Sequence, residues 1–166
     1  MALPTAVVRA VTTLTFTENA ANTNTITIGG KVYTLQTTLT NVDGNIDIGA
    51  DTAATIEQIV AAVGLGDGAG TAYAAAMTAN PHVRVRSYTA TTIVFEAKIP
   101  GVIGNLIPSS DTLAGTSAFT STVMGSGSGS ASLFIEEVLE QCNLNSEVRT
   151  LLNAFLGSEL EPAAIA

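Results

Sequence analysis

Two short alternating runs around a glycine pair constrain the fold of this chain more than any other feature. Residues 25–28 read Thr-Ile-Thr-Ile, residues 31–36 read Lys-Val-Tyr-Thr-Leu-Gln, and Gly29-Gly30 lies between them. A period of two is typical of strands with one buried face, and a Gly-Gly pair suits a two-residue turn. The sequence therefore predicts a β-hairpin over residues 25–36.

Further alternating runs predict more strands. Residues 11–18 alternate Leu14 and Phe16 with threonines, which indicates a strand with one buried face. Residues 83–86 and 92–98 predict two antiparallel strands near the hairpin, and residues 117–124 predict a last, weak strand. The segments 41–49 and 100–108, rich in turn-forming residues, are expected to be loops.

One segment has the clear pattern of an amphipathic helix. Residues 51–63 place Ile56, Ile59, Val60 and Val63 on one face, with Asp51 or Thr52 as N-cap and Gly64 just past the end. After a glycine-rich loop, residues 71–79 predict a short Ala-rich helix that Pro81 ends. The predicted class is α+β: one small antiparallel sheet of five or six strands with one main packed helix.

The run Gly-Ser-Gly-Ser-Gly-Ser at 125–130 divides the chain by composition, since such runs form flexible linkers. It separates a β-rich α+β domain, residues 1–124, from a helical assembly tail, residues 131–166. In the tail, Ser132 and Ser146 can cap two short helices. The second helix carries an apolar stripe, which we name the tail stripe and predict to be a docking element: Val148, Leu151, Leu152, Phe155 and Leu156.

Two helices of about ten residues are not stable alone in water, so the tail stripe must be buried against something. It can pack inside its own chain, or it can dock into a groove on a neighbouring subunit. Both alternatives are open from the sequence.

The composition favours a protein that is covered by partners. Apolar residues make up 46% of the chain and charged residues only 12%, so neutral Thr, Ser, Asn and Gly supply much of the surface. The net charge is −8, and the cluster His82, Arg84 and Arg86 is too small for a nucleic-acid surface. No apolar run is long enough to span a membrane, and the start of the chain does not read as a secretory signal. The single Cys142 allows no internal disulfide.

No motif predicts catalysis, a cofactor or a metal centre. The glycine loop at 64–70 follows a helix, whereas a dinucleotide fingerprint follows a strand. Asp43, Asn45 and Asp47 resemble the start of a calcium loop, but Ile48 replaces its glycine and no bidentate Glu follows. An Asp-Gly turn is the simpler interpretation, and cation binding by these three residues is left open. We therefore expect no enzyme activity, no cofactor and no small-molecule substrate.

Three motifs carry a resemblance to a known class of protein. They are Ile-Gly-Gly-Lys-Val-Tyr at 28–33, Gly-Thr-Ala-Tyr at 70–73 and Gly-x-x-Gly-Asn at 101–105. With the segments between them, covering about two thirds of the chain, they resemble a β-rich module that recurs in head, tail and fibre-associated proteins of tailed bacteriophages.

The resemblance implies a structural subunit of a virion, assembled in the host cytoplasm: an accessory protein such as a capsid decoration or a neck, tail or fibre-attachment component. Its partners would be other virion proteins and copies of itself, and no functional residues are carried over. The alternative is a ligand- or glycan-binding module of a fibre or surface adhesin. The chain has three Tyr and no Trp, so aromatic platforms for sugars are scarce.

Overall fold

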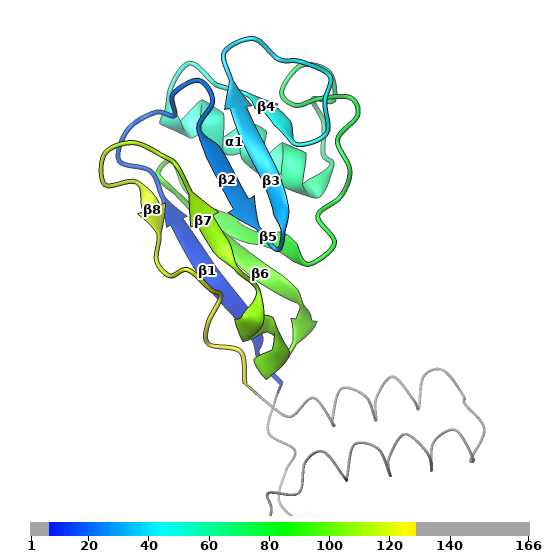
Figure 1. The fold of residues 1–166 in the computed structure, drawn as a ribbon, viewed down its shortest axis with the longest axis vertical. Coiled ribbons are helices and arrows are strands. Elements are labelled where there is room, and N and C mark those ends of the chain that lie inside the picture. The colour runs from blue at the N-terminus through cyan, green and yellow to red at the C-terminus, as the bar shows by residue number, and fades with distance from the viewer. Residues whose placement is uncertain (1–6, 129–166) are drawn as a thin grey trace, which may run out of the picture.

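The computed structural model describes residues 7–128 of the chain, which form two four-stranded sheets with one α-helix and one 3-10 helix (Figure 1). In chain order the elements are β1 (Arg9–Thr15), β2 (Thr25–Ile28), β3 (Lys31–Gln36), β4 (Asn45–Asp47), α1 (Thr52–Gly64), β5 (Val83–Tyr88), β6 (Thr92–Pro100), η1 (Val102–Leu106), β7 (Ser109–Asp111) and β8 (Ala118–Phe119). The sheet orders are β5-β6-β1-β8 and β4-β3-β2-β7. The predicted α+β class is confirmed for these residues, but the single sheet of five or six strands is wrong.

Strand β1 lies inside the first sheet, because it pairs antiparallel with β6 on one side and with β8 on the other. Its alternation buries Leu14 completely, and Phe16, one residue beyond the strand, continues the buried face. Strand β5 pairs with the other side of β6, which confirms the predicted antiparallel pair. This pair adjoins β1 and belongs to a different sheet from the hairpin, although Asn80 joins the start of β5 to the hairpin by hydrogen bonds to Ile28 and Tyr33.

The predicted hairpin is confirmed as β2 and β3 in the second sheet. Gly29 and Gly30 have φ angles of 61° and 79°, the left-handed backbone that a two-residue turn requires and that glycine adopts without strain. Strand β7 pairs antiparallel with β2, whereas β4 pairs parallel with β3. Strand β4 lies in the segment 41–49 that was predicted to be a loop, and its parallel pairing makes this sheet mixed, whereas an antiparallel sheet was predicted.

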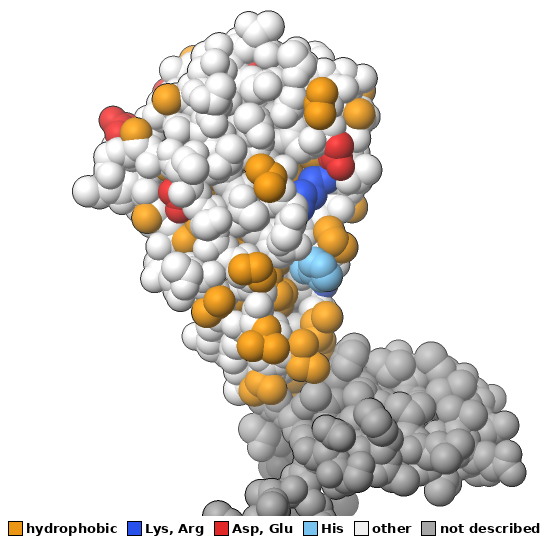
Figure 2. Space-filling model, viewed as in Figure 1, with side chains coloured by type: hydrophobic (Ala, Val, Ile, Leu, Met, Phe, Trp, Pro, Cys, Tyr) orange, Lys and Arg blue, Asp and Glu red, His pale blue; other side chains and the backbone are white. Residues whose placement is uncertain are grey.

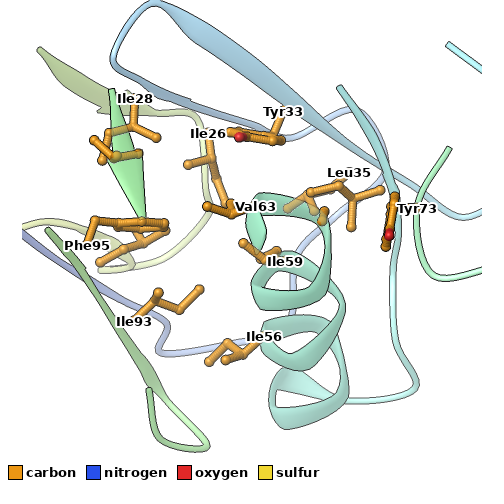
Figure 3. Close-up of a cluster of buried hydrophobic side chains, with 14 of the residues drawn as sticks. Ile26, Ile28, Tyr33, Leu35, Ile56, Ile59, Val63, Tyr73, Ile93 and Phe95 are labelled. Carbon is orange, nitrogen blue, oxygen red and sulfur yellow. The ribbon is translucent and has the colours of Figure 1, made fainter. Parts of the chain in front are cut away.

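Helix α1 packs against both sheets, in contact with β4 of one and with β5 and β6 of the other. Figure 3 shows Ile56, Ile59 and Val63 on the helix among the buried side chains of the strands, with Ile93 and Phe95 of β6 close by. All five of these side chains are at least 95% buried. The predicted apolar face of the helix is therefore confirmed, and it joins the two sheets into one core.

The ends of α1 follow the sequence closely. The Asp51 carboxylate accepts a hydrogen bond of 2.9 Å from the backbone N–H of Ala54, as an N-cap does. At the other end Gly64 is the last helical residue, and Leu65 adopts the left-handed conformation expected of Gly64, with a φ of 52°.

The segment 71–79 is not helical, so the second helix predicted within the domain is wrong. This segment runs along the free edge of β4, where the N–H of Ala74 donates to the carbonyl of Asn45 at 2.9 Å. The aromatic side chain of Tyr73 is buried in the core. Pairing with a sheet edge and burial of an aromatic ring outweigh the modest helix propensity of a run of alanines.

The predicted strand over 117–124 is reduced to the two residues of β8, followed by isolated bridges. The chain then returns to the start of the domain. Gly125 exchanges two backbone hydrogen bonds with Val11, at 2.7 and 2.9 Å, and Ser128 exchanges two with Val8, at 2.8 and 3.1 Å. The first four residues of the predicted linker therefore belong to the ordered domain. The predicted helical tail, residues 131–166, lies outside the described residues.

A candidate assembly surface at one end of the domain

Large apolar side chains gather on the surface at the narrow end of the domain (Figure 2). Leu106 is 78% exposed and Val102 is 50% exposed. We name the set the apolar end surface; it consists of Val8, Ile99, Val102, Ile103, Leu106 and Val123, all exposed. Backbone hydrogen bonds and bridges link their segments at this end, including those of Val8 with Gly101 and of Val123 with Pro108. Contiguous apolar surface of this kind marks contacts with partners more often than isolated exposed side chains do.

The short helix η1 holds this surface in place. Gly101 follows β6 with a φ of 81° and is the N-cap residue of η1. Gly104 packs so closely that a Cβ at this position would lie 2.9 Å from the Cβ of Ala10 and 3.0 Å from that of Ala97. Because η1 presses a glycine onto small residues of β1 and β6, its larger side chains face outward.

The asparagine of the Gly-x-x-Gly-Asn motif fixes the chain where it leaves the domain. The Asn105 side chain accepts from the N–H of Gly127 at 2.8 Å and donates to the carbonyl of Gly127 at 3.1 Å. One amide thus satisfies both backbone groups of Gly127, as a neighbouring strand would. The asparagine of this motif therefore has a structural role, next to the apolar end surface.

A groove of about 410 Å³ runs between η1 and the β2–β3 turn, and we name it the apolar groove. Its volume falls in the range of ordinary binding pockets, roughly 300 to 1,000 Å³. Its lining is Gly29, Gly30, His82, Ile99, Ile103, Leu106, Ile107 and Pro108. Only His82 brings a titratable side chain, so the groove is suited to apolar side chains and has few groups for orienting a polar ligand.

Basic side chains lie near the apolar groove. Lys98 precedes the groove residue Ile99, and its Nζ donates to the carbonyl of Asn80 at 2.6 Å. Arg9 donates through Nη1 to the carbonyl of Ala97 at 3.2 Å. Within residues 7–128 neither side chain pairs with a carboxylate, whereas Arg84 is matched by Glu96, with Nε 2.8 Å from Oε2. Both cations, Arg9 and Lys98, therefore lie near the groove, although neither belongs to its lining.

The segment that leads into β5 at His82 is held in place by the buried side chain of Asn80. Its Nδ2 donates to the carbonyl of Ile28 at 3.1 Å and to the Tyr33 hydroxyl at 3.3 Å. Its Oδ1 accepts from the backbone N–H groups of His82 at 2.9 Å and Val83 at 3.1 Å. Burial raises the pKa of Tyr33 to about 12, although the hydrogen bond with Asn80 opposes this. This network ties the hairpin to the start of β5 and sets one wall of the groove.

The residues that resembled a calcium loop do not converge on one point. The Asp43 carboxylate is held by Lys31, with Nζ 2.7 Å from Oδ1, and by the hydroxyl of Thr78 at 2.6 Å. Burial raises the pKa of Asp43, but the hydrogen bonds from Lys31 and Thr78 outweigh it and lower the pKa to about 2. The Asn45 amide instead donates to the hydroxyl of Thr40 at 2.6 Å.

Asp43 therefore ties the hairpin to the segment before β5 by structural bonds. Residues 7–128 contain no group of three or more His, Cys, Asp or Glu side chains placed to hold a metal ion. They also contain no helix long and apolar enough to cross a membrane.

A second groove, of about 430 Å³, lies over β7 and β8 and is lined mainly by hydroxyl groups. Several of its polar groups bond to the chain itself: the Ser109 hydroxyl donates to the carbonyl of Ser121 at 2.6 Å, and the Asp111 carboxylate accepts from two backbone N–H groups. Its aromatic residue, Phe119, is partly buried and packs at 6.0 Å between ring centroids on Phe95.

The sequence pattern predicted docking residues only in the tail, and we did not predict the apolar end surface or the groove on the domain. The tail stripe, residues 148–156, lies outside the described residues. Four of the eight residues that line the apolar groove, Ile103, Leu106, Ile107 and Pro108, lie in the segment that was predicted only as a Gly- and Pro-containing loop. The signal in the sequence for the apolar end surface and the groove is four large apolar residues in that loop, more than a solvent-exposed connection needs: Val102 of the surface, and Ile103, Leu106 and Ile107 of the groove lining.

Comparison with known proteins adds no relative: no family model, no curated protein and no solved structure matches this chain.

Proposed function

We propose that the protein is a non-catalytic structural subunit of a tailed-phage virion, an accessory component such as a capsid decoration or a neck, tail or fibre-attachment protein. The observation that supports this best is the apolar end surface, where Leu106 and Val102 are half or more exposed. Its partners are other virion proteins and copies of itself, and it is located in the virion after assembly in the host cytoplasm.

The energetics of the surface favour a role in assembly. Each large apolar side chain that a partner covers fully contributes about 1.5–3 kcal/mol. Charged residues make up only 12% of the chain, so few charges would lose their hydration in such a contact. Two polar side chains buried in the domain, Asn80 and Thr55, bond to the chain's own backbone and side chains, which accounts for them as structural groups.

The test is incorporation of a variant with a charge on the apolar end surface. Val102→Asp changes an exposed residue outside the lining of the apolar groove, so the fold should be retained. A buried, unpaired carboxylate at a contact costs more than about 1.4 kcal/mol, which corresponds to at least a tenfold weaker contact. We expect the copy number in purified particles to fall accordingly.

The matched control is Tyr88→Asp, because Tyr88 is also 50% exposed but lies at the far end of β5. It should be incorporated like the wild type. Equal incorporation of Val102→Asp and the wild type would contradict the proposed contact surface.

A glycan-binding module is the second candidate, and the hydroxyl-lined groove over β7 and β8 is the observation that favours it. Sugar sites usually offer an exposed aromatic face, and this groove offers only the edge of the partly buried Phe119. Saturable binding in a glycan-array screen, lost on Ser110→Ala and Thr120→Ala, would favour this alternative.

A further inference from the structure

The chain leaves the described domain beside the apolar groove. Ser128, the last described residue, pairs with Val8, and Gly127 is held by Asn105 of η1. The same short helix supplies Ile103 and Leu106 to the lining of the groove. The remaining residues, 129–166, therefore follow on at the end of the domain that carries the groove.

The sequence of those residues offers a matching apolar element. The tail stripe repeats at helical spacing, with Leu151 and Phe155 four apart and Leu152 and Leu156 four apart. Seventeen residues, 129–145, separate Ser128 from Ser146, and an extended chain spans up to about 3.3–3.6 Å per residue. The tail stripe is thus within reach of the groove of its own chain.

Charge also matches. Residues 129–166 carry six acidic side chains against Arg149 alone, a net charge of −5. Arg9 and Lys98 do not line the groove, but they bond to backbone carbonyls close to its lining residues, those of Ala97 and Asn80, and both carry a positive charge. An acidic segment with an apolar face is therefore a better occupant of this groove than a neutral or basic one.

We propose that the apolar groove is the binding site of residues 146–157 of the same chain, so that the free subunit covers part of its own assembly surface. A short tether gives the segment an effective concentration on the order of 1 mM at the groove. Even a weak contact, with a Kd of about 100 µM, then keeps about ten subunits closed for each open one. A partner in the particle would compete for the groove and expose the tail stripe. The inference rests on the proposed function only for this last step, and its test uses the isolated protein.

Limited trypsin digestion tests the contact, because Arg149 lies inside the proposed helix and is the only Lys or Arg beyond residue 128. Proteases cut locally opened segments, so cleavage after Arg149 reports the open fraction. Leu106→Asp puts a charge into the groove at a side chain that is 78% exposed, which leaves the core intact. We expect it to speed cleavage after Arg149 about tenfold, measured by mass spectrometry of the 1–149 product.

Phe155→Asp should speed cleavage by the same factor, and the double variant should be no faster than either single variant, because both remove one contact. Tyr88→Asp, on the far end of β5, should leave the rate unchanged. The wild-type rate constant should not depend on protein concentration.

Two results would overturn the proposal. Equal cleavage rates for wild type and Leu106→Asp would mean that the groove does not hold the segment. Protection that appears only as the concentration rises would assign the groove to the tail of a second copy. Because this assay needs no particle, its failure leaves the incorporation result for Val102→Asp standing, and failed incorporation leaves this result standing.

Discussion

Gly104 should tolerate no larger residue, because η1 is pressed against two strands at this position. In Gly104→Ala the added Cβ would lie 2.9 Å from the Cβ of Ala10, 3.0 Å from that of Ala97 and 3.2 Å from the carbonyl oxygen of Ile99. Two of these neighbours are Cβ atoms fixed to strand backbone, so none can rotate away. Overpacking of this kind costs about 1–3 kcal/mol in the free energy of unfolding. For a domain of this size we expect Tm to fall by at least about 3 °C.

The matched control is Gly64→Ala, the same chemical change in open space. Gly64 is the last residue of α1, and a Cβ there would meet nothing within 4 Å. Alanine loses less backbone entropy than glycine on folding, so this variant should be stabilised by about 0.4–1 kcal/mol. Urea unfolding of both variants measures the two changes in the free energy of unfolding, which should have opposite signs. If Gly104→Ala were as stable as the wild type, η1 would not be packed as described, and the placement of the apolar end surface would be wrong.

Three further predictions follow from the contacts of the domain. Asn80→Ala removes four hydrogen bonds from a buried site and should lower the free energy of unfolding by about 3 kcal/mol in urea melts; a loss below about 1 kcal/mol would contradict the network. The pKa of Asp43 is depressed, so its carboxylate contributes stability above its unfolded pKa, near 3.8, and loses that contribution as the pH falls toward about 2. Because the side chain is 46% exposed, solvent screening limits the effect to about 1 kcal/mol or less, and Asp43→Asn should flatten the stability curve between pH 4 and 2. A chain ending at Ser128 should unfold cooperatively, whereas one ending at Met124 should melt several degrees lower, since it lacks the backbone bonds to Val8 and Val11; equal melting curves would show that residues 125–128 add nothing.

The parts of the fold that could be predicted from sequence are those determined by residues close together in the chain. The hairpin follows from alternation on both sides of Gly29-Gly30, and both glycines take the left-handed conformation that the turn needs. Helix α1 follows from its apolar face and from the N-cap Asp51. In each case the residues that carry the sequence pattern are the same residues that form the element.

The parts that could not be predicted depend on partners distant in sequence. Strand β4 has only three residues, and it forms because β3 and the segment around Tyr73 pair with its two edges. The same pairing keeps the Ala-rich segment out of a helix. The composition of residues 125–128 is typical of a linker. In the structure, however, Gly125 and Ser128 form backbone hydrogen bonds with Val11 and Val8, as a strand would.

The candidate site also has one part that the sequence predicts and one part that it does not. The tail stripe has a helical period and can be read from sequence, although the structure does not describe it. The groove on the domain has no period, because its lining comes from a turn, the start of β5, the end of β6 and η1, which only the folded chain brings together. Leu106 in particular looks like an ordinary loop residue until its exposure is known.

The most direct test of the proposal that this chain is a virion subunit is its copy number in purified phage particles, measured by quantitative mass spectrometry against the major capsid protein. If the protein is a structural subunit, it should remain with the particles through density-gradient purification and high-salt washing, at a fixed ratio to the capsid protein that reflects a symmetric site. A chain that is absent from the particles, or present at a ratio that varies from one preparation to the next, would contradict the assignment.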